Sequence, residues 1–352
     1  MSRPVAALVI LSSLALLAPA SRGGAQTAPR APAETPRFGE RIDVRLVPLV
    51  VRVVDKRGRP VMELGPENFT VRVAGRKRPV RFVDWVDSGA ALPATLRDLE
   101  TPAKLWARPE ELPGKLVVLF YQSDLQRARL KGQLLLRPQV REFLEMLDPN
   151  DLSAVVSFDS HLRLIQDFSS DPRLLAAATD RAYLRGGGPP VRSFTFPSLA
   201  EHLDSGAARR TASPEQALAL LGDALAKLPG EKILVYIGWG LPRSGGVGWS
   251  ADYGKAISSL ARARVAVFVL DVTEADFHSL EFGLKQVAWD TGGTYFRTYP
   301  LSGMAVKKLA STISGYYVLY LPIEDLPPGS HPVSIRLRGA NGSVLKRTTH
   351  IG

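Results

Sequence analysis

The stretch "LVVLFYQSDLQ", residues 116–126, decides the fold of this chain. Residues 116–120 form an unbroken apolar run that follows Pro113 and Gly114, and polar residues come directly after it. Such a run predicts a parallel strand buried on both faces, because strands with one exposed face alternate apolar and polar residues. Ligands of open α/β sheets bind at the carboxyl ends of strands of this kind. The residues expected at this corner are Tyr121, Gln122, Ser123 and Asp124.

Further buried runs with helical patterns between them predict the rest of the sheet. The other expected strands are "DLSAVVSFD" (151–159), "LRLIQDF" (162–168), "KILVYIG" (232–238), "RVAVFVLDV" (264–272) and "TYFRTY" (294–299). The second of these follows the first after only two residues, which predicts an antiparallel pair. Helices are expected within 140–149, 172–184, 214–228, 251–263 and 278–291. This order indicates an α/β fold with a doubly wound, mostly parallel sheet of six strands.

Strand patterns without helices flank this domain. Residues 41–87 read as a small all-β module, in which "NFTVRV", "AGRKR" and "PVRFVDW" are expected to form a hairpin. Residues 88–114 read as a linker, and 115–314 as the α/β domain. In 315–352, "HPVSIRLR" and "SVLKRTTHIG" are expected to pair through the Asn-Gly turn between them. The sequence leaves open whether these strands complete one module with 41–87.

The first 40 residues are expected to direct export. Residues 5–17 are apolar, and Ala-Pro-Ala at 18–20 fits a signal-peptidase site, with Ala25 as an alternative. An uncleaved anchor is the other interpretation, although no stretch reaches the roughly 20 apolar residues of a stable membrane helix. Residues 21–40 are rich in Pro, Ala and Gly, which predicts a disordered linker. The chain has no cysteine, which suits a bacterial periplasm, and we expect a periplasmic or extracellular protein.

The charge balance is basic, with a formal net charge of +11. Such a balance favours anionic partners, but the cations are scattered and "AGRKRP" at 74–79 is the only tight cluster. No nucleic-acid-binding signature accompanies it, so we expect no nucleic-acid partner. An anionic envelope polymer is the alternative partner for the basic surface.

Several spaced segments resemble one family. The strand at 115–121, "FLEMLDPNDLSAVVSFDSHLRLIQDFSSD", "KILVYIG", "VAWDTGGTYF" and "ISGYYVLYLP" are similar to the von Willebrand factor A-related proteins abundant in acidobacteria. Residues 50–85 resemble the β segment that precedes the A domain in that family. The resemblance covers most of 41–338 and implies an A-domain fold, often with a metal-ion-dependent adhesion site. In that site, oxygen ligands hold Mg²⁺ octahedrally, and an acidic residue of the partner completes the shell.

The ligands of this adhesion site carry over poorly. The family motif Asp-x-Ser-x-Ser has Tyr121 at its Asp position, Ser123 at its first Ser and Leu125 at its second. The Asp expected after "KILVYI" is replaced by Gly238-Trp239-Gly240, and Thr195 or Ser198 stands near the family's Thr. Without a carboxylate, hydroxyl groups do not offset the dehydration of Mg²⁺. We therefore expect a degenerate site and no cofactor. The alternative is a weak Mg²⁺ site of Ser123, Asp124 and Thr195, which requires that Asp124 points inward.

No catalytic arrangement is evident, and we expect no enzyme. The five histidines lack paired metal-ligand spacing, and neither a G-x-S-x-G elbow nor a P-loop occurs. Asp159 and Asp271 end core strands, where each suits a turn or a cap.

The residues instead predict a protein-interaction module that acts at the carboxyl edge of the sheet or through the β module. The candidate partner-binding residues are Tyr121, Gln122, Ser123, Asp124 and Trp239, of which Tyr121 and Trp239 could equally pack beneath loops. The alternatives are a metal-dependent adhesion module and a basic surface for anionic envelope polymers.

Overall fold

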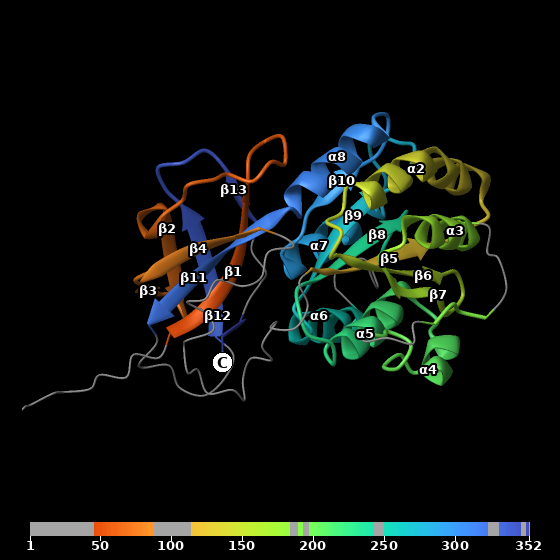
Figure 1. Cartoon of the computed structure of the whole chain (residues 1–352), viewed down its shortest axis with the longest axis horizontal. Coiled ribbons are helices and arrows are strands. Elements are labelled where there is room, and N and C mark those ends of the chain that lie inside the picture. The colour runs from red at the N-terminus through yellow and green to blue at the C-terminus, as the bar shows by residue number, and fades with distance from the viewer. Residues whose placement is uncertain are drawn as a thin grey trace, which may run out of the picture. The chain divides into compact units, whose positions relative to one another are not determined.

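The computed structural model describes residues 46–87, 114–183, 189–192, 197–242, 250–322, 331–345 and 350–351. All of them belong to one compact unit, Val44–Gly352. They form a six-stranded sheet with helices on both faces and two four-stranded sheets without helices (Figure 1). The predicted signal peptide, the 21–40 linker, residues 88–113 and Thr195 lie outside the described residues.

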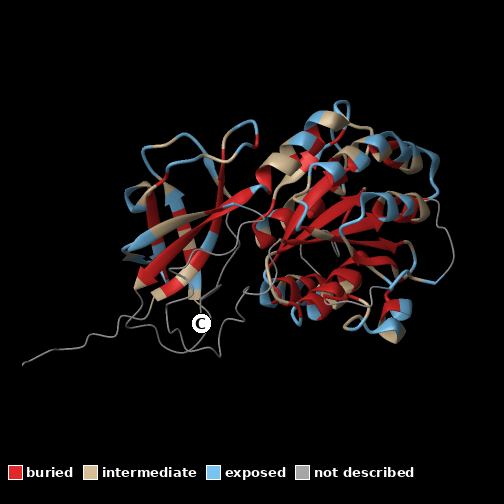
Figure 2. Ribbon diagram, viewed as in Figure 1, coloured by how far each residue is buried: buried red, intermediate tan, exposed pale blue. Residues whose placement is uncertain are grey.

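The six-stranded sheet has the order β10-β9-β8-β5-β6-β7. Its strands are β5 (Leu116–Gln122), β6 (Leu152–Phe158), β7 (Leu162–Ser169), β8 (Lys232–Gly238), β9 (Val265–Asp271) and β10 (Tyr295–Arg297). All neighbours pair in parallel except β6 and β7, which are antiparallel. The predicted fold class is therefore confirmed. Every residue of β5, β8 and β9 is buried, as their unbroken apolar runs predicted (Figure 2).

Two layers of helices cover this sheet. The helices are α2 (Arg127–Glu145), α3 (Pro172–Tyr183), α4 (Ser205–Arg210), α5 (Pro214–Leu225), α6 (Ala251–Arg262), α7 (Glu281–Thr291) and α8 (Ser302–Thr312). Apolar side chains of α2, α3 and α8 pack with Leu119 and Val235 on one face. Those of α5, α6 and α7 pack with Phe120 and Leu234 on the other. Figure 1 shows α2, α3 and α8 together on one side of the sheet and α5 and α6 on the opposite side.

The helix boundaries follow local capping chemistry where the sequence carries it. The Ser213 hydroxyl accepts a hydrogen bond from Gln216 N at the start of α5, and Ser250 caps α6 in the same way. Gly292 ends α7 with a φ of 78°, a conformation that costs glycine little. The helix predicted within 140–149 corresponds only to the last part of α2. The missed part carries exposed Leu134 and Leu135 and an internal Pro138, which obscure the helical period.

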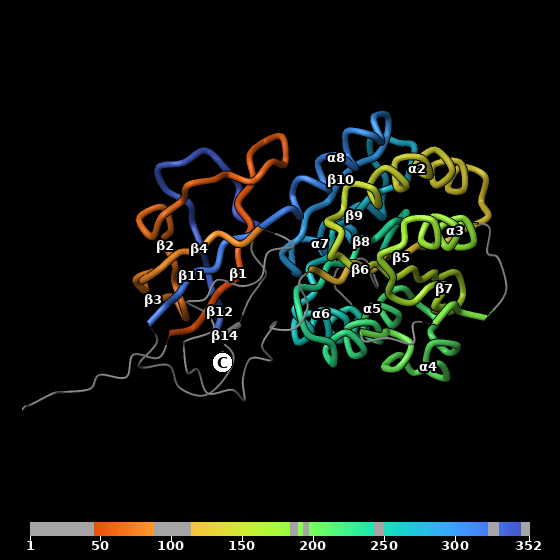
Figure 3. Tube along the Cα trace, viewed as in Figure 1, coloured from red at the N-terminus to blue at the C-terminus, as the bar shows by residue number. Residues whose placement is uncertain are grey.

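The remaining strands form the two four-stranded sheets. One has the order β13-β1-β11-β4, with β1 (Leu46–Val54), β4 (Phe82–Asp87), β11 (Gly315–Pro322) and β13 (Ser343–Leu345). The other has the order β14-β12-β2-β3, with β2 (Phe69–Val73), β3 (Arg76–Arg78), β12 (His331–Leu337) and β14 (His350–Ile351). The short 3-10 helix η1 (Pro66–Asn68) precedes β2. A shared core joins the sheets, with Val51 and Leu319 from one and Val71 and Ile335 from the other. Figure 3 shows β1 beside β11, which comes from the far end of the sequence.

Two predicted hairpins are wrong in part. β2 and β3 do pair, but β4 leaves them and pairs with β11 in the other sheet. Likewise β12 pairs with β2, whereas β13 pairs with β1, so the Asn-Gly turn carries the chain from one sheet to the other. The partner of a short strand depends on packing against segments far away in sequence. The local turn signals therefore did not show which strand each one pairs with.

No helix within the described ranges combines the length and the apolar character needed to cross a membrane.

Candidate functional site

The candidate site lies where β5, β8 and β9 end. The register places Tyr121 beside Ile237, and Gly238 beside Asp271, so the three strands end at the same edge of the sheet. The chain then continues into Ser123 and Asp124 after β5, and into Trp239 after β8. We call the edge of the sheet where these three strands end the carboxyl edge.

Tyr121 is a core residue and takes no part in the surface. Its side chain is fully buried, and its ring packs edge-on against Tyr183 at a centroid distance of 4.9 Å. Burial raises the pKa of Tyr121 far above its ordinary value, so it stays neutral. The expectation that Tyr121 contacts a partner is corrected by this burial. The sequence did not show the reason, which is that the helix layer of α2 and α3 covers this end of β5.

Gln122 clamps two strand ends together. Its side-chain oxygen accepts hydrogen bonds from Trp239 N at 2.9 Å and Gly240 N at 3.0 Å, and its amide donates to Gly240 O at 2.8 Å. Gln133 of α2 donates to the Gln122 carbonyl at 2.6 Å. Gln122 is only 2% exposed. It therefore holds the loop after β8 in place and is not itself a contact residue.

The side chains of Ser123 and Asp124 also form their polar contacts within the chain. The Ser123 hydroxyl is buried and donates to Ala182 O at 2.9 Å. One oxygen of Asp124 accepts a hydrogen bond from Gln126 N at 2.8 Å, and the other pairs with the Arg129 guanidinium. Asp124 thus serves the start of α2.

Arg129 is the residue that the sequence interpretation missed. Its guanidinium carbon lies 3.4 Å from the centroid of the Trp239 ring, so one cation contacts both Asp124 and Trp239. Trp239 is half-buried beneath it. The available signal was a cation five residues after an Asp that precedes a helix. The triad of Asp124, Arg129 and Trp239 joins the ends of β5 and β8.

These residues do not fit a Mg²⁺ ion. Mg²⁺ needs near-octahedral oxygen ligands, usually with a carboxylate, and gives up its water reluctantly. Both Asp124 oxygens already have partners, one of them a guanidinium that would repel a second cation. Ser198, the alternative to Thr195, donates its hydroxyl hydrogen to Asp167 at 2.6 Å. Among the described residues, no group of three or more His, Cys, Asp or Glu side chains could hold a metal.

A second cluster surrounds Asp271 at the end of β9. Its buried carboxylate contacts His278 Nε2 at 2.6 Å, and it accepts hydrogen bonds from the Tyr295 hydroxyl at 2.6 Å and Thr273 N at 2.9 Å. Burial and then the charge of Asp271 raise the pKa of Tyr295 above its ordinary value. The sequence predicted a capping role for Asp271, and the contact with Thr273 N agrees with that role. The pairing with His278 and Tyr295 was not predicted.

Exposed apolar side chains follow β9 and β10, on the loops after these strands and in the first turn of α8. The exposed fraction is 78% for Phe277, 58% for Leu301, 54% for Met304 and 43% for Tyr299. The two loops start side by side, because Thr298 N donates to Asp271 O at 3.2 Å, and Asp276, next to Phe277, lies 4.0 Å from the Arg297 guanidinium. We call these four residues the edge patch. Groups of exposed apolar side chains mark interaction sites more often than single exposed residues do.

Comparisons with known proteins give distant structural matches. No protein-family profile and no curated protein matches the sequence. A von Willebrand factor type A protein from Catenulispora acidiphila is 11% identical, with 86% of this chain and 72% of that chain covered and a TM-score of 0.40. The BatB protein from Bacteroides thetaiotaomicron is 15% identical, with coverages of 57% and 97% and a TM-score of 0.36.

The PilB minor pilin from Streptococcus sanguinis is a further match. It is 14% identical with a TM-score of 0.35, and the match covers 57% of this chain and 60% of the pilin, less than two thirds of its length. Similarity this low carries no functional argument. The fold class rests on the strand order described above.

Proposed function

We propose that this chain is an exported, non-enzymatic protein-interaction module of the von Willebrand factor A type, with a degenerate metal-ion-dependent adhesion site. The edge patch is the observation that carries the proposal. Phe277, Tyr299, Leu301 and Met304 expose aromatic and apolar side chains at the edge of the sheet where ligands of such folds bind. A protein surface with apolar side chains and few charges matches this patch best.

The arrangement of charges supports contact that does not depend on a metal. Arg129 supplies a fixed cation beside Asp124 and Trp239. The partner therefore needs no acidic residue to complete a metal shell.

The state of the polar groups also supports a non-enzymatic role. A general acid or base must be able to reach a substrate. At the carboxyl edge, Asp124 is paired with Arg129, and Asp271 is buried against His278 and Tyr295.

Partner capture with matched variants tests the proposal. The full chain is used to capture partners from a periplasmic extract, alongside Phe277→Asp and Leu301→Asp. Each variant should lose the captured partner, whereas Val50→Asp, on a β1 side chain that is 50% exposed, should keep it. Capture that survives both edge-patch changes would contradict the proposal.

Calorimetry tests the rival metal-dependent adhesion module. Titration of the purified chain with Mg²⁺ or Mn²⁺ should give no saturable heat, and EDTA should leave partner capture unchanged. Saturable binding of Mg²⁺ that Asp124→Asn abolishes would favour the rival.

The β module supports a second candidate, a surface for anionic envelope polymers. Arg72 on β2 lies directly opposite Lys77 on β3, and Arg76 and Arg78 flank Lys77 along the strand. Like charges in this position destabilise a strand pair unless an anion screens them. If this candidate is right, Lys77→Glu should weaken binding to an acidic polysaccharide, and binding should fall steeply as salt rises. Binding that is insensitive to salt would exclude it.

A further inference from the structure

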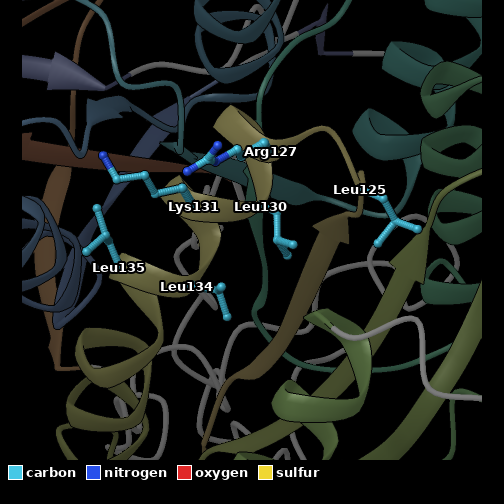
Figure 4. Close-up of a pocket in the computed structure, with 6 residues that line it drawn as sticks. All are labelled: Leu125, Arg127, Leu130, Lys131, Leu134 and Leu135. Carbon is cyan, nitrogen blue, oxygen red and sulfur yellow. The ribbon is translucent and has the colours of Figure 1, made fainter.

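Helix α2 has a second apolar stripe that points away from the sheet. Val140 and Phe143 face the core, whereas Leu134 and Leu135 are 43% and 54% exposed. The first half of this stripe lines a groove of about 430 Å³ (Figure 4). The residues that line the groove are Leu125, Arg127, Leu130, Lys131, Leu134 and Leu135. Exposed apolar patches of this kind mark interaction sites.

The two ends of the stripe carry opposite charges that pair with no other described residue. Arg127 begins α2 and Glu145 ends it, both are exposed, and neither forms an ion pair within the described chain. The two residues are separated by about five turns of 3.6 residues, so they lie on the same face of the helix. Leu134 and Pro138 lie between them on that face.

Both charges oppose the dipole of their own helix. A helix favours acids in its first turn and bases in its last turn. The first turn of α2 contains no acid and its last turn contains no base. A second copy of this helix running antiparallel would place an acid beside the first turn and a base beside the last. These charges would offset the unfavourable interaction of both end residues with the helix dipole.

We propose that the occupant of this stripe is a second copy of the chain, packed through α2 about a two-fold axis between Leu134 and Pro138. Arg127 of each copy pairs with Glu145 of the other, and Leu134 packs against Pro138. The same axis brings Leu125, 58% exposed, against Met146, 41% exposed, so apolar side chains also meet at the ends. An isologous interface requires this kind of self-complementarity, in which each contact occurs twice.

The other charges on the stripe do not prevent this packing. Lys131 and Arg141 approach each other across the axis, but each has an acid of its own. Lys131 pairs with Glu274 at 2.7 Å, and Arg141 pairs with Asp180 at 2.7 Å. A single pair of helices buries less than the roughly 1,200 Å² of a standard interface. The dimer is therefore weak, with an expected Kd of about 10–100 µM.

Charge reversal tests the dimer, using sedimentation velocity of the full chain up to about 500 µM, well above the expected Kd. Arg127→Glu and Glu145→Arg should each weaken self-association about tenfold or more, because each turns two attractions into repulsions. The two variants mixed in equal amounts should associate as the wild type does, since both end contacts become attractive again. The double variant R127E/E145R should also associate.

Two controls separate loss of the dimer from misfolding and from partner binding at the edge patch. Far-UV circular dichroism and urea midpoints should show that both single variants fold, because each new charge suits the helix dipole. Leu301→Asp, in the edge patch, should leave self-association unchanged, so this inference can fail while the proposed function stands. A wild type that stays monomeric, single variants that associate normally, or a mixture that fails to recover association would each overturn the proposal.

Discussion

Replacing Gln122 with methionine should destabilise the fold while preserving the volume of the side chain. Gln122 makes three side-chain hydrogen bonds to the backbone of the loop after β8, at 2.8 to 3.0 Å. Methionine fills the same space but makes none of them. The variant therefore tests whether the clamp, and not packing, holds the end of β5 to the end of β8.

The expected cost follows from the groups that lose their partner. Gly240 N is buried and is left without an acceptor, and Trp239 N is part-buried, so water reaches it in part. Gly240 O keeps a weak donor in the Tyr236 hydroxyl at 3.4 Å. With about 1–3 kcal/mol for each orphaned buried group, the free energy of unfolding should fall by about 2–3 kcal/mol.

Urea denaturation followed by tryptophan fluorescence measures this change. The midpoint should fall while the slope with urea stays the same, which shows that stability and not compactness has changed. Gln126→Met, at an exposed position in the same segment, is the matched control and should stay within about 0.5 kcal/mol of the wild type. A Gln122→Met variant as stable as this control would refute the reasoning.

Two further predictions concern buried ionisable groups. Asp151 contacts Lys115 Nζ at 2.5 Å with both side chains buried, so Asp151→Asn should cost about 3 kcal/mol in urea denaturation, and K115M/D151N should recover much of it. Burial raises the pKa values of Tyr121 and Tyr183, so both stay protonated in the fold at a pH where the unfolded chain releases protons. The free energy of unfolding should therefore fall above about pH 10, by about 1.4 kcal/mol per pH unit for each tyrosine. Tyr121→Phe removes one of these tyrosines and should make the fall less steep by the share of one tyrosine. A Tyr121→Phe slope equal to that of the wild type between about pH 10 and 11 would contradict the assignment.

Much of the α/β fold could be predicted, because its signals are local. The unbroken apolar runs of β5, β8 and β9 identify buried parallel strands without reference to anything else in the chain. Ser213 and Gly292 mark helix ends through hydrogen bonds and dihedral angles that a few neighbouring residues control. The short link between β6 and β7 fixes their antiparallel pairing. The sequence interpretation missed α8, which begins after Leu301 without a side-chain cap.

The candidate site was harder to predict, because each role depends on a residue far away in sequence. From their place after an apolar run, Gln122 was expected at the surface, and Tyr121 either at the surface or packed beneath loops. The side chains of α2 and α3 bury Tyr121, and the loop after β8 takes up the hydrogen bonds of Gln122. Arg129 could not be placed over Trp239 without knowing how α2 lies relative to β8.

The sequence by itself determined the buried strands of the six-stranded sheet and the absence of the two carboxylates that an adhesion site of the resembled family uses. Both depend on residue type and spacing along the chain. Only the tertiary structure decided the pairing of β1 with β11, the cation contact between Arg129 and Trp239, and the exposure of the edge patch. The physical reason is that packing and hydrogen bonds between distant segments choose the partner of each strand and side chain, and such contacts leave no local pattern.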